Sequence, residues 1–173
     1  MKKMKRLVAV LLAGIMVLAM LTACGGGLST PTSDVEKAEA LYMDAFNTAL
    51  GTNYENNNTE LKDQAKQVLD TNLNDDGTLK SGQKMTSKKY EGITAWTTFT
   101  ILAQPGNENV PYGITSKELA ETLANKDKAI AEVRSNFDKM GVTKETTTGL
   151  AVGAVKKGDK VYVAIAVKTE RKK

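Results

Sequence analysis

The sequence contains no histidine, and its only cysteine is Cys24. The lack of histidine excludes a Ser-His-Asp triad, a Cys-His pair, a histidine-ligated zinc site and a histidine general base. An enzyme built from this chain would have to work with carboxylates, lysine, tyrosine or hydroxyl groups alone. We therefore expect a protein that is not an enzyme and that needs no metal ion or other cofactor.

The single cysteine lies at the end of a hydrophobic segment near the start of the chain. Four cations, at positions 2, 3, 5 and 6, precede an apolar run over residues 7–21. At about 1.5 Å per residue, a helix of roughly 15 residues spans about 22 Å, which is less than the ~30 Å core of a bilayer. The pattern predicts a cleaved secretory signal rather than a transmembrane helix.

The segment Leu21-Thr22-Ala23-Cys24 resembles the lipobox of bacterial lipoproteins. This resemblance implies that residues 1–23 are a lipoprotein signal peptide and that Cys24 becomes a lipidated first residue, carrying a diacylglyceryl group. Residues 24–33 are rich in glycine, serine and threonine, which favours a flexible tether. We expect a lipid-anchored protein on the extracytoplasmic face of the cell membrane. In the alternative, an ordinary secretion signal is removed and Cys24 is incidental.

The net charge of +4 does not indicate a nucleic-acid partner. The chain has 24 Lys and Arg against 20 Asp and Glu, and four of the cations belong to the predicted signal. The remaining cations and anions balance, whereas binding to a phosphate backbone needs an excess of Lys and Arg. The basic end at Lys168, Arg171, Lys172 and Lys173 is interpreted as a solvated tail, with contact to anionic lipid headgroups as the alternative.

Two helices are predicted directly after the tether. Ser33 and Glu36 have the spacing of a capping box, and apolar residues then recur at helical spacing up to Gly51. Asn58 or Thr59 can cap a second helix. The apolar side of this second helix consists of Leu61, Ala65, Val68 and Leu69.

The segment Asn72–Leu79 resembles the first half of an EF-hand calcium loop, because oxygen-bearing side chains alternate before Gly77. Its first position would be the neutral Asn72, and its twelfth would be Gln83, which lacks the closing carboxylate. We therefore favour a helix-terminating Asp-Gly turn over a calcium site.

The remaining elements are strands and two further helices. Residues Ile93 to Ala103 read as a strand with apolar side chains on both faces, ended by Pro105-Gly106. Thr115 and Glu118 form a second capping box, the helix that they start runs to about Asn125, and a following helix ends at Gly141 as an αL cap. Residues 150–155 and 161–167 read as a hairpin.

Neither strand of this hairpin has a polar face. Val161, Val163, Ile165 and Val167 lie on one side, and small residues with Tyr162 lie on the other. Both faces of the sheet therefore need cover. We predict an α+β fold, a three-layer α-β-α sandwich with a central antiparallel sheet, formed by one domain over residues 34–173.

The order of elements and several short motifs resemble the CAP superfamily, the SCP-like extracellular domain. The match is carried by Glu108-Asn109-Val110-Pro111-Tyr112-Gly113 and then Thr115-Ser116-Lys117-Glu118-Leu119, with weaker likeness at Phe46-Asn47, Leu50-Gly51, Leu61 and Ala65. Many family members hold two His and two acidic residues in a central cavity. Here only Glu108 falls on such a position, and Lys126 lies near the second acid. The resemblance implies a degenerate, non-catalytic CAP-like domain without that metal site.

We therefore expect a binding protein for an extracellular ligand, which would be a lipid, a wall component or a protein. The candidate ligand-binding residues are Glu108, Asn109 and Tyr112, on a concave surface; Glu108 could instead be a structural carboxylate. Two alternatives remain. One is a structural or assembly role in the cell envelope, and the other is a carboxylate-dependent hydrolase using acids such as Asp75 with Asp76, or Glu118 with Glu121.

Overall fold

The computed structural model of the protein describes residues 33–171, apart from residues 57 and 141 and the side chains of residues 135–140. Its helices are α2 (Asp34–Leu50), α3 (Thr59–Asn72), α4 (Ser116–Ala124) and α5 (Lys126–Met140). Its strands are β1 (Thr86–Tyr90), β2 (Ala95–Ile101), β3 (Ala103–Gln104), β4 (Asn107–Pro111), β5 (Ile114–Thr115), β6 (Thr147–Lys157) and β7 (Lys160–Glu170).

The main sheet is built around β7, the last strand. Strand β2 and the short β5 pair with β7 along one side, β6 pairs with its other side, and β1 extends the sheet beyond β2. All of these pairings are antiparallel. The long β6–β7 hairpin turns at Gly158, whose φ of 61° lies in the left-handed region that favours glycine. The predicted hairpin is confirmed and is longer at both ends.

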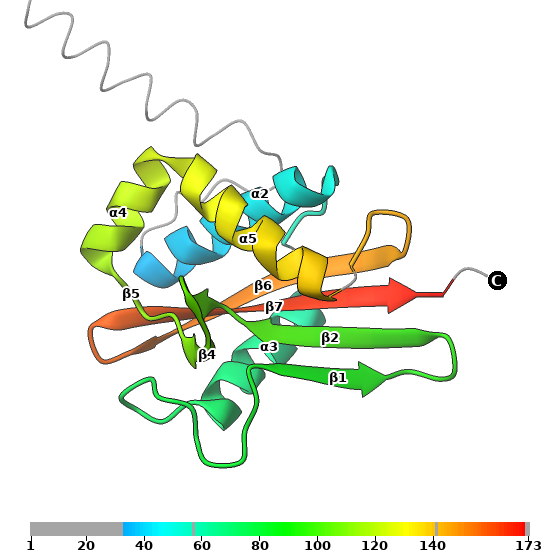
Figure 1. Cartoon of the computed structure of the whole chain (residues 1–173), viewed down its shortest axis with the longest axis horizontal. Helices are drawn as coiled ribbons and strands as arrows, with labels where there is room; N and C mark the ends of the chain where they lie inside the picture. The colour runs from blue at the N-terminus through cyan, green and yellow to red at the C-terminus, as the bar shows by residue number, and fades with distance from the viewer. Residues whose placement is uncertain (1–32, 57, 141, 172–173) are drawn as a thin grey trace, which may run out of the picture. The chain divides into compact units, whose positions relative to one another are not determined.

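Helices cover both faces of this sheet, as Figure 1 shows. Helices α2, α4 and α5 lie on one face, where their apolar side chains pack with Val161, Val163, Ile165 and Val167 of β7. Helix α3 covers the other face and packs with Tyr162, Ala164 and Ala166 of the same strand, together with residues of β2 and β6. The predicted α+β fold, with its three α-β-α layers and antiparallel centre, is confirmed.

Local signals explain where the helices begin. The Ser33 hydroxyl accepts from the Glu36 N–H, and the Glu36 carboxylate accepts from the Ser33 N–H, so the first capping box is complete. Asn58 caps α3 by accepting from the Leu61 N–H at 3.0 Å. Helix α2 ends at Gly51, which has a φ of 66°. These capping residues fix the entry points of helices on both faces.

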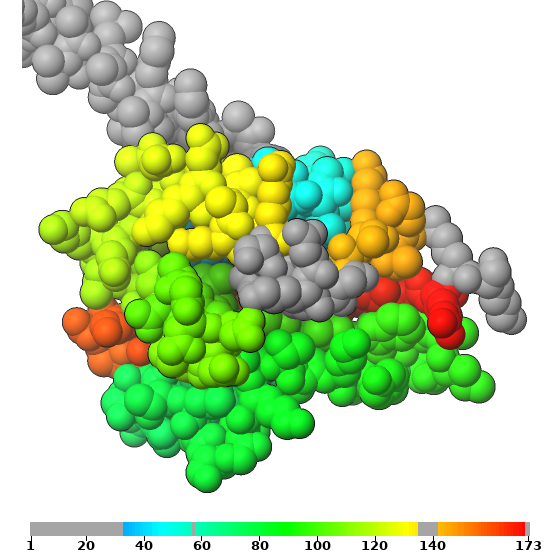
Figure 2. Space-filling view, in the orientation of Figure 1, coloured from blue at the N-terminus to red at the C-terminus, as the bar shows by residue number. Residues whose placement is uncertain are grey.

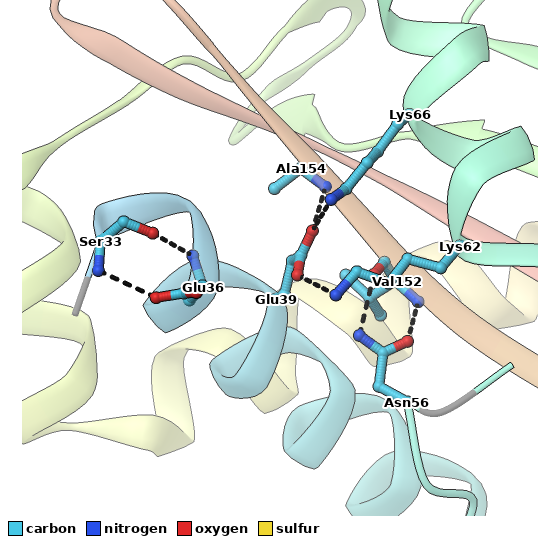
Figure 3. Close-up of polar contacts among 8 residues, drawn as sticks. All are labelled: Ser33, Glu36, Glu39, Asn56, Lys62, Lys66, Val152 and Ala154. Carbon is cyan, nitrogen blue, oxygen red and sulfur yellow. Dashed lines mark hydrogen bonds and ion pairs between the residues drawn. The ribbon is translucent and has the colours of Figure 1, made fainter. Parts of the chain in front are cut away.

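The free edge of β6 is closed by side chains, as Figure 3 shows. The Asn56 amide donates to the Val152 carbonyl at 2.9 Å and accepts from the Val152 N–H at 3.0 Å, as a neighbouring strand would. The Glu39 carboxylate accepts from the Ala154 N–H at 3.2 Å. Glu39 is 3% exposed and forms ion pairs with Lys62 at 2.5 Å and Lys66 at 3.1 Å. Both outward backbone groups of Val152 and the outward N–H of Ala154 are therefore satisfied.

Two sequence predictions about the sheet were wrong. The strand predicted from Ile93 begins at Ala95, because Ile93 lies in the β1–β2 turn and is 99% exposed. The chain also breaks at Leu102 between β2 and β3. The basic end is not simply a tail: Lys168 belongs to β7, and its ammonium lies 2.8 Å from the Glu91 carboxylate.

Several predictions lie outside the described residues: the signal peptide over 1–23, the lipidation of Cys24, the tether up to residue 32, and the αL cap at Gly141. Within the described part of the chain, no helix has both the length and the apolar character needed to cross a bilayer.

Candidate ligand-binding site

The predicted residues Glu108 and Asn109 lie on a bulge of the small β3–β4 hairpin. Ala103 of β3 pairs with Pro111 of β4, and the next residue of β3, Gln104, pairs with Asn107. Residues 108–110 are therefore the extra residues that form the bulge on β4. Such extra residues bend a strand and turn its side chains outward. The Asn107 side chain supports the bulge by accepting from the Asn109 N–H at 3.2 Å. Figure 2 shows the hairpin standing out between α4 and the loop after α3.

The base of this hairpin is fixed to the centre of the main sheet. The Leu102 N–H donates to the Val163 carbonyl of β7 at 2.9 Å, and the Tyr112 N–H donates to the Leu102 carbonyl at 2.8 Å. Leu102 itself is buried. The bulge is therefore presented from a rigid support, which is the arrangement that binding loops generally need.

A groove lies on each side of the bulge. The first, which we call the tyrosine groove, has a volume of about 460 Å³ and is lined by Asp76, Gly77, Thr78, Leu79, Gln104, Asn109, Val110, Pro111, Tyr112, Gly113, Thr115, Glu118, Lys160 and Tyr162. The second, the threonine groove, has a volume of about 570 Å³ and is lined by Leu79, Gln83, Lys84, Met85, Thr86, Lys88, Thr98, Thr100, Ile101, Ala103, Glu108 and Asn109. Asn109 and Tyr112 thus share a groove, whereas Glu108 lines the other.

Two glycines shape the tyrosine groove around the ring of Tyr162. A Cβ atom on Gly77 would lie 1.8 Å from the Tyr162 hydroxyl oxygen, and one on Gly113 would lie 2.5 Å from it. Gly77 also has a φ of 81°. The predicted Asp-Gly turn is therefore confirmed, and it brings the loop after α3 against β7.

The two carboxylates of the tyrosine groove are held by their own turns. Asp76 accepts from the N–H and the hydroxyl of Thr78 at 2.9 and 2.6 Å, and these bonds lower its pKa. Glu118 accepts from the N–H and the hydroxyl of Thr115 at 2.9 and 2.7 Å, and these bonds likewise lower its pKa. Both groups are ionised at neutral pH, beside one cation, Lys160.

The two phenols of this groove remain protonated. Burial raises the pKa of Tyr162, and the carboxylates of Asp76 and Asp159 add to the shift. Burial also raises the pKa of Tyr112, with further contributions from Glu118 and Glu132. The Tyr162 hydroxyl is buried and donates to the Asp76 carbonyl at 3.5 Å, so it supports the loop after α3. The half-buried Tyr112 keeps a hydroxyl that can donate a hydrogen bond to a ligand, attached to an apolar ring.

The sequence singles out Asn109 and Tyr112 as candidates, and both line this groove, but it does not indicate the other residues that line it. Tyr162 read only as a residue of a sheet face, and Asp76 and Gly77 read only as a turn. The Asn72 amide, the first position of the calcium-loop alternative, donates to the Lys84 carbonyl at 3.0 Å. Across the described residues, no group of three or more His, Cys, Asp or Glu is placed to hold a metal ion.

Comparison with known proteins found no matching family model, no matching curated protein and no matching solved structure. The lipobox and the CAP-like motifs therefore remain predictions from the sequence.

Proposed function

We propose that this chain is a lipid-anchored extracytoplasmic protein whose α-β-α domain binds an envelope ligand in the tyrosine groove without transforming it. The observation that carries the proposal is the set of fixed polar groups in one groove. The protonated phenol of Tyr112 and the ionised carboxylates of Asp76 and Glu118 lie there with the Asn109 side chain, above the buried ring of Tyr162. The proposal does not depend on membership of the CAP superfamily.

The chemistry of the groove favours a wall component among the three expected ligand classes. Carboxylate, amide and phenol groups can bind the hydroxyl and amide groups of a glycan or glycopeptide, while the half-buried ring of Tyr112 offers an apolar face. A lipid would instead need a pocket lined mainly by aliphatic and aromatic side chains. In the tyrosine groove the aliphatic lining is limited to Leu79, Val110 and Pro111.

The pKa directions support binding rather than catalysis. An acid-base pair needs two groups whose environments push their pKa values apart, so that one stays protonated. In the tyrosine groove the pKa values of Asp76 and Glu118 are both lowered, so neither is suited to act as a general acid. Glu132 has a raised pKa because it is half-buried, but it is not among the residues that line this groove.

Calorimetric titration with soluble wall fragments tests the binding proposal. Suitable probes are a β-1,4-linked N-acetylglucosamine tetramer and a muramyl peptide, with vesicles of phosphatidylglycerol as the lipid comparison. We expect saturable binding of a wall fragment, weakened about tenfold by Tyr112→Ala, which corresponds to ~1.4 kcal/mol. Asn109→Ala should weaken binding by a smaller factor.

Tyr90→Ala is the matched control, because Tyr90 is a 70% exposed tyrosine on β1 and lines neither groove. Binding unchanged by Tyr90→Ala and weakened by Tyr112→Ala would support the site. No saturable binding of either fragment, or equal loss in both variants, would contradict it.

The predicted lipid anchor is tested separately by intact-mass spectrometry of protein recovered from bacterial membranes. We expect the mass of residues 24–173 with an added diacylglyceryl group, and we expect this addition to be absent from Cys24→Ala. If the first residue of the mature wild-type chain carries no lipid, the protein is released rather than anchored, and the proposed lipid anchor is wrong.

A further inference from the structure

The outer edge of β1 is open. This strand is last in the sheet order, its only partner among the described strands is β2, and all five of its residues are exposed. An open edge carries backbone N–H and C=O groups that can pair with another extended chain.

The register shows which residues present these groups. Just before β1 in the sequence, the Met85 carbonyl accepts from the Ile101 N–H at 2.8 Å. Just after β1, the Glu91 N–H donates to the Ala95 carbonyl at 2.9 Å. In an antiparallel pair, inward-facing and outward-facing residues alternate. The backbone groups of Met85 and Glu91 point toward β2. Because the direction alternates from residue to residue, the N–H and C=O groups of Thr86, Lys88 and Tyr90 point outward.

Each face of this edge is bordered by a groove. The threonine groove includes Thr86 and Lys88 of β1. On the other face a groove of about 280 Å³, which we call the amide groove, is lined by Gln64, Gln67, Val68, Thr71, Asn72, Lys89 and Phe99. Successive side chains of a strand point to opposite faces. A chain paired with β1 would therefore direct alternate side chains toward the two grooves.

The segment that leads into β1 and forms it is positively charged. Between Gly77 and Tyr90 the sequence has four lysines and no Asp or Glu. Lys80 is turned toward the end of α3, where it donates to the carbonyls of Asp70 and Thr71. Lys84 and Lys88 line the threonine groove with three threonine hydroxyls, and Glu108 is the single carboxylate in that lining. The threonine groove thus suits acidic side chains.

The amide groove differs in character. Val68 and Phe99 contribute apolar surface, Gln64 and Gln67 contribute amides, and Lys89 is its one charged residue. It suits uncharged and apolar side chains. The two faces of β1 therefore prefer different residues at alternate positions.

From this placement we infer that β1 binds an extended peptide as an added strand, with acidic residues over the threonine groove and apolar residues over the amide groove. Backbone hydrogen bonds to Thr86, Lys88 and Tyr90 supply affinity, and the grooves supply selectivity. This interaction goes beyond the proposed ligand and uses a different surface. A second copy of this chain fits the edge less well, because full two-fold overlap of two β1 strands sets Lys88 directly opposite its own copy.

The test uses a fluorescent peptide, acetyl-Glu-Val-Glu-Ile-Glu-Val-Glu-amide, titrated with the folded protein and followed by anisotropy. We expect saturable binding that weakens at least about tenfold when lysine replaces every glutamate. A peptide N-methylated at alternate residues, on the side that faces β1, keeps its charges and should lose a similar factor. The proposal would be wrong if the acidic peptide did not bind, or if N-methylation left its affinity unchanged.

A matched pair of variants tests the backbone contribution from the side of the protein. Lys88→Ala removes the charge, whereas Lys88→Pro removes both the charge and the outward N–H without removing a bond to β2. With folding confirmed by circular dichroism, we expect about threefold weaker binding for Lys88→Ala and at least about tenfold for Lys88→Pro. Equal effects would overturn the added-strand geometry. Sedimentation showing self-association that Lys88→Pro abolishes would assign the edge to a second copy instead.

Discussion

The two edges of the main sheet differ in whether other parts of the chain bond to their outward backbone groups. At the β6 edge, the Asn56 side chain bonds both outward backbone groups of Val152, and the Glu39 side chain accepts from the outward N–H of Ala154 (Figure 3). At the β1 edge, every residue is exposed, and no described strand pairs with the outward groups. One edge is closed by the chain itself, and the other is available.

This difference shows that an edge can be closed without another strand. The Asn56 amide carries a donor and an acceptor on one group, so it reproduces the hydrogen bonds of a peptide unit. The closure requires a buried carboxylate, Glu39, which two lysines of α3 compensate. The β1 edge carries Lys88 and Lys89 instead, and charged residues on an edge discourage indiscriminate strand pairing. An open but charged edge is suited to a selected partner.

The largest expected effect comes from Glu39→Ala. This change leaves the Ala154 N–H without its acceptor and leaves Lys62 and Lys66 without their shared partner. Because both lysines retain some solvent contact, we expect a loss of about 2–3 kcal/mol in the free energy of unfolding, measured by urea denaturation. Glu39→Gln, which keeps an acceptor but no charge, should lose less. A loss below about 0.5 kcal/mol for Glu39→Ala would show that the carboxylate does not hold the edge.

The next effect comes from Gly153→Ala, which tests how closely α3 covers β6. A Cβ atom there would lie 2.7 Å from the Lys62 carbonyl oxygen and 2.9 Å from the Lys66 nitrogen, both on the helix backbone. We expect about 2 kcal/mol of destabilisation, because α3 must shift. Gly149→Ala is the matched control on the same strand, since its nearest contacts are side-chain atoms at 3.3 Å. Equal stability of the two variants would contradict the close approach.

Asn56→Ala should open the covered edge at moderate cost. The variant loses both hydrogen bonds to Val152, and we expect about 1–2 kcal/mol of destabilisation by urea denaturation. Asn56→Asp keeps the acceptor but faces the Val152 carbonyl with a carboxylate, so it should not restore stability. If Asn56→Asp were as stable as the wild type, the donor half of the closure would be unnecessary.

The smallest effect concerns the ion pair beside the open edge. The hydrogen bond from Lys168 lowers the pKa of Glu91 below its ordinary value of 4.5. The folded state therefore binds fewer protons there than the unfolded state, so the contribution is present above about 4.5 and is lost as pH falls through the lowered value. In thermal melts, Glu91→Gln should flatten the fall in Tm on acidification. Because both side chains are partly exposed, the difference should shrink in about 1 M salt. Identical melting profiles for both proteins would show that the pair contributes nothing.

Much of the fold follows from local rules. The two capping boxes, the cap at Asn58 and the alternation along β7 each determine one structure from adjacent residues, and they predict the helices and the three layers. Strand β1 was missed because Thr86-Ser87-Lys88-Lys89-Tyr90 has no apolar face. It is a strand only because β2 pairs with it.

The candidate site was predictable only in part. Asn109 and Tyr112 belong to one short motif, so a sequence argument could select them together. The groove that they share needs Asp76 and Tyr162, which are distant in sequence and meet because Gly77 leaves room for the Tyr162 ring. Asn56 likewise reads as an ordinary loop residue, and its role depends on β6 lying beside it.

Amide hydrogen exchange, followed residue by residue by NMR, tests the contrast between the two edges most directly. We expect protected amides at Val152 and Ala154, and fast exchange at Thr86 and Lys88 that slows when the acidic peptide is added. In Asn56→Ala, protection should be lost at Val152. Equal protection of the two edges in the free protein would contradict the contrast between them, because either the β6 edge would not be closed or the β1 edge would not be open.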